Sequence, residues 1–132
     1  MQRDVELIRS LMLEIEGGRA DFVCLSSEEC EILGIEDTEL SQNRARQLSH
    51  HIQLLSERNL VMFARTGTHW HVERILWDGH DFLDSVRDEE VWNKTRAGVR
   101  KAGVFTFDFL VDVAKGFAKT QLEKHTGIEL SK

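Results

Sequence analysis

The stretch 48–83 constrains the fold more than any other part of the chain, and it reads LSHHIQLLSERNLVMFARTGTHWHVERILWDGHDFL. Apolar residues at three- and four-residue spacing, beginning with Leu48, Ile52 and Leu55, predict an amphipathic helix. The runs LVMFAR and WHVERIL flank TGTH, which predicts a β-hairpin, and another helical pattern follows. This order favours the second half of a winged helix-turn-helix domain, a DNA-binding fold in which one helix enters the major groove.

The remainder of the chain predicts further helices and one short strand. The run DFVCL is typical of a strand, and the region from Thr38 to Arg58 is compatible with one helix or with two. Residues that commonly start or end helices mark the expected boundaries. They are Asp4, Ser26 or Ser27, and Thr38 or Ser41 at the starts, and Gly17, Gly18 and Gly34 at the ends. We therefore expect an α+β fold, with a winged helix-turn-helix domain over residues 1–90. Residues 91–132 would form a C-terminal helical extension that packs on this domain or on a second subunit.

Composition favours a cytoplasmic protein of modest size. The chain has 132 residues, of which 41% are hydrophobic. No apolar run approaches the roughly 18 residues that a membrane span requires, and the first ten residues lack the apolar segment of a signal peptide. Two cysteines, Cys24 and Cys30, are too few for a disulfide framework.

Charge is distributed unevenly along the chain, whose net charge is −6. Residues 1–40 hold 3 basic and 11 acidic side chains, whereas residues 41–76 hold 5 basic and 2 acidic ones. The positive surplus falls on the expected helix and hairpin, where phosphate contacts would be made. It is small, however, and acidic neighbours reduce the local potential.

A DNA-reading surface is the functional hypothesis that follows from this fold. The outer face of the expected helix carries side chains able to bond base edges, and the hairpin tip carries polar groups that could contact phosphate. The candidates are Asn43, Arg46, His50 and Gln53 on the helix, and Arg65, Thr66, Thr68 and His69 at the tip. The alternative is an ordinary solvated helix face and a polar turn without a ligand.

Catalytic and metal-binding hypotheses are weaker. The pair His69 and His71 lies on one face of a strand, but no second ligand pair has convincing spacing. A second polar group includes Asp78, His80, Asp81 and Asp84. It lacks a nucleophile, a phosphate loop and a cofactor motif, and helix capping explains its carboxylates. We expect no enzyme activity, no cofactor and no metal.

An apolar stripe on the last expected helix, near residues 106–124, suggests a homodimer. Large apolar patches on soluble proteins often mark interfaces. The candidate interface residues are Phe107, Leu110, Ala114 and Phe117. The alternative is that the same chain covers the stripe.

Four short motifs resemble an uncharacterised bacterial and prophage-associated group, domain-of-unknown-function family 2513. They are the opening Arg3, Asp4, Leu7, Ile8 and Arg9; the helix positions His51, Leu54 and Leu55; the segment LWDGHDFLD at 76–84; and the box WNKT at 92–95. The resemblance implies a winged-helix-like fold and no particular activity.

Together these observations favour a small DNA-binding or transcription-associated protein, linked by the resemblance to phage or mobile elements. The alternative is a winged helix that binds protein instead of double-stranded DNA, as an adaptor or as an inhibitor of a host protein.

Overall fold

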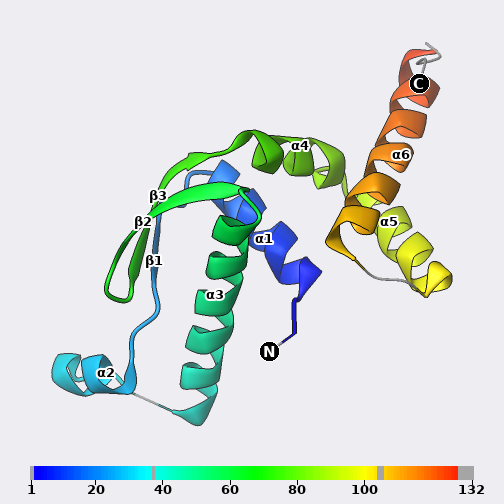
Figure 1. The fold of residues 1–132 in the computed structure, drawn as a ribbon. Helices are drawn as coiled ribbons and strands as arrows, with labels where there is room; N and C mark the ends of the chain where they lie inside the picture. The colour runs from blue at the N-terminus through cyan, green and yellow to red at the C-terminus, as the bar shows by residue number, and fades with distance from the viewer. Residues whose placement is uncertain (1, 37, 104–105, 128–132) are drawn as a thin grey trace. The chain divides into compact units, whose positions relative to one another are not determined.

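The chain folds into an α+β structure of helices and one antiparallel sheet (Figure 1). The computed structural model describes residues 2–36, 38–103 and 106–127. These residues fall into two compact units, Met1–His80 and Asp81–Lys132, which we describe separately. The division lies earlier than the boundary after residue 90 that the sequence suggested. No helix of the described ranges is long and apolar enough to span a membrane.

The first unit combines three helices with a three-stranded sheet. In chain order its elements are α1 Val5–Glu16, β1 Asp21–Val23, α2 Ser27–Leu33, α3 Glu39–Glu57, β2 Val61–Thr66 and β3 His69–Ile75. The sheet order is β1-β3-β2, and both pairings are antiparallel. The predicted hairpin is therefore confirmed as β2 and β3, and the strand predicted at DFVCL pairs with β3.

Side-chain caps fix where the helices begin. The Asp4 carboxylate accepts the backbone N–H groups of Glu6 and Leu7 at the start of α1. Ser26 and Glu29 form a reciprocal capping box at the start of α2, and Thr38 caps α3. Such caps satisfy N–H groups that have no partner within the helix. The region after Thr38 is one continuous helix, because nothing between Glu39 and Glu57 interrupts its backbone.

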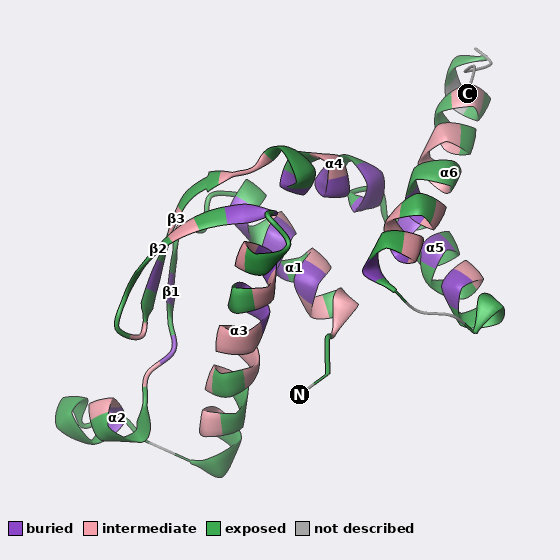
Figure 2. Ribbon diagram, viewed as in Figure 1, coloured by how far each residue is buried: buried purple, intermediate pink, exposed green. Residues whose placement is uncertain are grey.

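The core of the first unit lies between the helices and one face of the sheet (Figure 2). Phe22 of β1, Phe63 of β2 and Trp70 of β3 form edge-to-face aromatic pairs, with ring centroids 6.4 and 5.6 Å apart. The buried side chains from helices and strands include Ile8, Leu11, Met12, Ile15, Phe22, Ile52, Leu55, Val61 and Trp70. Leu48, expected to point inward, is half-buried. Cys24 and Cys30 are buried free thiols, and burial raises the pKa of Cys24.

His51 joins α3 to the start of α1. Its side chain is completely buried. Nε2 accepts the backbone N–H of Asp4 at 2.8 Å, and Nδ1 lies 2.8 Å from the carbonyl oxygen of Gln47. A carbonyl only accepts hydrogen bonds, so Nδ1 carries the proton and the ring is the neutral Nδ1–H tautomer. The histidine is therefore a structural residue that uses both ring nitrogens.

Helix α4, Trp77–Val86, begins against the backbone that leads into β2. The backbone N–H of Leu76 donates to the carbonyl oxygen of Leu60 at 2.9 Å. A Cβ atom placed on Gly79 would lie 2.0 Å from that same oxygen. Only glycine leaves room for this approach.

The second unit contains the end of α4 together with α5, Glu89–Ala102, and α6, Phe107–Thr126. Asp88 caps α5, and Thr106 caps α6. Helices α5 and α6 pack against each other, and the rings of Phe82 and Phe107 stack with centroids 5.3 Å apart.

Candidate interaction surface

The outward face of α3 holds the four predicted base-reading residues. Asn43, Arg46 and Gln53 are exposed, and His50 is half-buried. Arg46 donates to the side-chain oxygen of Asn43, and Gln53 donates to a carboxylate oxygen of Glu57 at 3.5 Å. The face is therefore polar and partly self-paired, and it includes an acidic group.

Arg65 near the hairpin tip is held by the chain itself. Its guanidinium lies 4.5 Å from the centroid of the Trp70 ring, and its Nε donates to the carbonyl oxygen of Gly67 at 3.0 Å. Thr66 next to it is exposed. A phosphate contact by Arg65 would compete with this cation–π contact, a type worth about 0.5–1 kcal/mol at an exposed site.

Carboxylates already bond the other two hairpin residues that were predicted to contact phosphate. Thr68 Oγ1 donates to Glu29 Oε2 at 2.7 Å, and His69 Nε2 lies 2.8 Å from Asp21 Oδ1. His71 Nδ1 bonds the same Asp21 oxygen at 2.9 Å. Hydrogen bonds from His71 and His69 lower the pKa of Asp21, and those from Thr68 and Ser26 lower the pKa of Glu29. Both groups are therefore anions where phosphate would have to approach.

His69 and His71 thus point toward one carboxylate, which is the arrangement that a metal hypothesis would require. Both imidazoles instead bond a single carboxylate oxygen. Across the part of the chain that the structure describes, no three His, Cys, Asp or Glu side chains are arranged to hold a metal ion. The three residues form a hydrogen-bonded group on the sheet.

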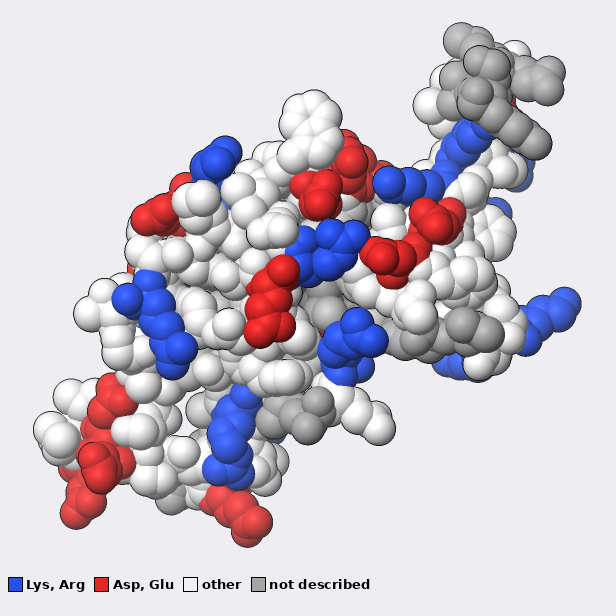
Figure 3. All heavy atoms as spheres, in the orientation of Figure 1, with Lys and Arg blue, Asp and Glu red and all other residues white. Residues whose placement is uncertain are grey.

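The net negative charge of the protein belongs to the first unit. Residues 1–80 contain 8 Lys and Arg against 14 Asp and Glu, whereas residues 81–132 contain 9 of each kind. In the face shown by Figure 3, acidic side chains gather over α2 and the start of α3, and the basic ones form separate groups among acidic neighbours. This face lacks the continuous positive area that phosphate binding favours.

Exposed apolar side chains in the stretch 32–40 form a feature that the sequence reasoning missed. Ile32, Leu33, Ile35 and Leu40 are 82%, 61%, 48% and 60% exposed. On α2 only Cys30 is buried, and Figure 2 shows the helix as mostly exposed. We call these four residues the α2 surface. An apolar run inside an acidic segment is the sequence signal that could have revealed it.

The stripe predicted as a dimer interface is largely covered within the second unit. Phe107, Leu110 and Ala114 are buried, and Phe117 is half-buried beside Gly98. Because one chain already buries three of the four, they are not open to a second subunit in this structure. Dimerisation itself stays a prediction.

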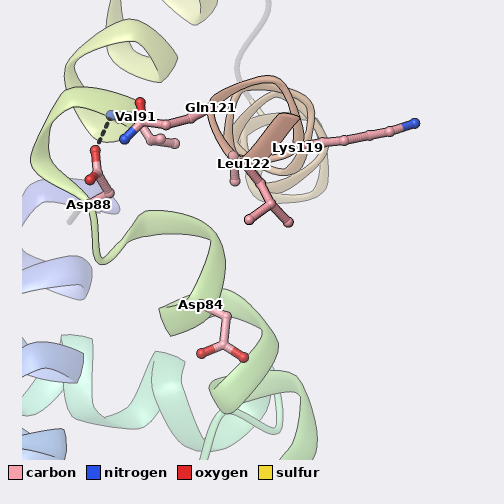
Figure 4. A pocket seen from close by; sticks show the side chains of 7 residues that line it. Asp84, Asp88, Val91, Lys119, Gln121 and Leu122 are labelled. Carbon is pink, nitrogen blue, oxygen red and sulfur yellow. Dashed lines mark hydrogen bonds between the residues drawn. The ribbon is translucent and has the colours of Figure 1, made fainter. Parts of the chain in front are cut away.

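A groove of about 420 Å³ runs along α6 in the second unit (Figure 4). Apolar atoms of Val91, Leu122 and Ala118 line it, with Asp84 and Asp88 nearby. The Asp88 carboxylate accepts the backbone N–H of Val91 at 2.9 Å, so it serves as a helix cap. The groove brings together no nucleophile and base pair that would indicate catalysis.

Comparison with known proteins agrees with the motifs described above. A protein of Haemophilus influenzae named "Uncharacterized protein" is 26% identical over 124 residues, which cover 91% of this chain and 94% of that protein. No solved structure matches the chain. The family described as "Hypothetical protein (DUF2513)" matches residues 2–105. The resemblance inferred from the motifs is thereby confirmed, and the chain belongs to the DUF2513 family.

Proposed function

We propose that residues 1–80 form a winged helix that recognises a protein partner. Support for the winged helix comes from the element order, α1-β1-α2-α3-β2-β3, and from the sheet order, in which β3 lies between β1 and β2. Winged helices share this arrangement of helices, strands and a final hairpin. The proposal corresponds to the second of the two functions that the sequence left open.

The pair of carboxylates at the hairpin is the main reason to propose a protein partner instead of DNA. Glu29 and Asp21 bond Thr68 and His69, the residues that would have to face DNA phosphates. Two like charges 4 Å apart repel by about 1 kcal/mol in water and by more in a lower dielectric. Repulsion of this size offsets the gain expected from each basic contact, and the first unit has 14 acidic side chains against 8 basic ones.

A two-armed binding experiment tests the proposal. The immobilised full chain is offered a pool of random-sequence DNA duplexes in one arm and a displayed library of random peptides in the other. We expect enriched peptides and no retained duplex. Retention of duplex that falls as salt is raised would instead indicate phosphate contact, because such binding releases counterions.

DNA recognition by α3 alone is the second candidate, and the exposed polar face of that helix favours it. Arg44, Arg46 and Gln53 face solvent, and these residue types can read guanine and adenine edges. In this case Arg46→Ala should weaken binding by about 1–3 kcal/mol at one or two base positions. The hairpin would contribute little, because its tip is paired internally.

A further inference from the structure

We infer that the α2 surface is a docking site for a protein segment in which apolar side chains stand next to Lys or Arg. This inference rests on the proposed function and assigns its site. Single exposed apolar residues are common on proteins. Four within the stretch 32–40, with exposures from 48% to 82%, are a concentration along the sequence, and exposed apolar groups that gather in this way often belong to interaction surfaces.

Helix α2, which carries Ile32 and Leu33 of this surface, is anchored with these two side chains outward. Ser26 and Glu29 form the capping box of α2, and Glu29 also accepts a hydrogen bond from Thr68 at 2.7 Å. Cys30 is the residue of α2 that turns inward and is buried. Burying Ile32 and Leu33 in the same unit would require α2 to rotate, which would break the hydrogen bond from Thr68 to Glu29 and expose Cys30.

Charge around the surface determines the chemistry of the partner. Residues 20–43 contain seven carboxylates and no Lys or Arg. Glu28, Glu31, Glu36 and Glu39 are exposed among the apolar residues, and Figure 3 shows acidic side chains gathered over this region. A second copy of the chain would bring two such acidic areas together, and opposed like charges disfavour that pairing. A partner with basic residues beside its apolar ones would match both the acidic charge and the apolar side chains of the α2 surface.

Selection from the displayed peptide library also tests this inference. The wild-type chain should enrich peptides in which Lys or Arg flank apolar residues. The double variant Ile32→Ser with Leu33→Ser should bind the enriched peptides at least about tenfold more weakly, the loss expected when interface hot spots are removed. Both side chains are exposed, so the variant should keep the far-UV circular dichroism and thermal transition of the wild type.

Matched controls separate this surface from general apolar or acidic attraction. Leu122→Ser removes a side chain that is 49% exposed on α6 and should leave peptide affinity unchanged. Charge reversal by Glu31→Lys should weaken binding several-fold, and reversal by Asp112→Lys on α6 should not.

Three results would overturn the inference. Peptides that bind the double variant as tightly as the wild type would place the site elsewhere, while the proposed protein-binding function would stand. Enrichment of acidic peptides would refute the assigned partner chemistry. Retention of duplex DNA with no enriched peptide would refute the proposed function, and the inference with it.

Discussion

A methyl group added at Gly79 tests how closely α4 approaches the start of β2. In Gly79→Ala the new Cβ would lie 2.0 Å from the carbonyl oxygen of Leu60, 2.8 Å from Ile75 Cγ2 and 2.9 Å from the Leu60 carbonyl carbon. Ordinary contacts of a Cβ atom begin near 3.4 Å. The oxygen belongs to the backbone, so the clash cannot be relieved by rotating a side chain.

The expected change in the free energy of unfolding of Gly79→Ala is the sum of three contributions. Overpacking that forces a backbone shift costs about 3 kcal/mol, the upper end of the usual range. The Leu60 oxygen also accepts the N–H of Leu76 at 2.9 Å, and losing that bond costs about 1 kcal/mol. Alanine in a helix gains about 1 kcal/mol over glycine. We therefore expect Gly79→Ala to lower the free energy of unfolding by about 3 kcal/mol.

Urea unfolding followed by far-UV circular dichroism measures this change. Gly116→Ala in α6 is the matched control, because among the described residues no atom outside the neighbouring helix backbone lies within 4 Å of its added Cβ. That variant should be more stable than the wild type by about 0.5–1 kcal/mol. If Gly79→Ala also proves neutral or stabilising, the close approach of α4 to Leu60 does not exist and the reasoning fails.

Three further predictions concern the core, the hairpin and assembly. His51→Leu should lower the free energy of unfolding by about 1–3 kcal/mol, because the partly buried backbone N–H of Asp4 loses its acceptor. A urea midpoint equal to that of the wild type would contradict the assigned bonds. Thr68→Val should raise the pKa of Glu29 toward its ordinary value of 4.5, because the charged carboxylate loses the hydrogen bond that lowers its pKa most. Carbon-13 NMR titration measures the pKa of Glu29, and the control Thr66→Val should leave that pKa unchanged. In the wild type the hydrogen bond should stabilise the fold above pH 4.5, and this stabilisation should be lost as the pH falls through the lowered pKa. Sedimentation equilibrium at micromolar concentration tests the predicted dimer. A dimer mass for the wild type that becomes a monomer mass in Phe117→Glu would support the dimer, and a monomer mass for both the wild type and the variant would reject it.

Features that depend on neighbouring residues could be predicted from the sequence. Asp4, Ser26 and Thr38 cap helices as expected, because a cap acts within three residues of its own position. The hairpin around Gly67 also follows from local turn chemistry. The capping patterns thus located the starts of α1, α2 and α3 before any tertiary contact was known.

Features that depend on distant contacts could not be predicted. His51 bonds a backbone group 47 residues away, and no local pattern indicates that pairing. The sequence left open whether a second subunit or the same chain covers the α6 stripe, because periodicity identifies an apolar face but not the element that covers it. In the structure Leu110 and Ala114 are buried without a second subunit.

For the candidate site, too, local features could be predicted from the sequence and distant contacts could not. The sequence correctly indicated that Asn43, Arg46 and Gln53 lie on an exposed helix face. It did not reveal that Glu29 of α2 bonds the hairpin residue Thr68, 39 residues away in sequence. It also did not reveal that Ile32 and Leu33 are exposed, because a pattern alone does not show which apolar side chains remain exposed.

Binding of duplex DNA at low salt distinguishes a winged helix that recognises protein from one that reads DNA. Fluorescence anisotropy of a labelled random-sequence duplex is measured as the full chain is added at about 50 mM salt, where phosphate contacts are strongest. We expect no saturable binding at micromolar protein concentrations. Submicromolar binding that weakens steeply as salt is raised, and that Arg46→Ala reduces, would contradict it and establish α3 as a DNA-reading helix.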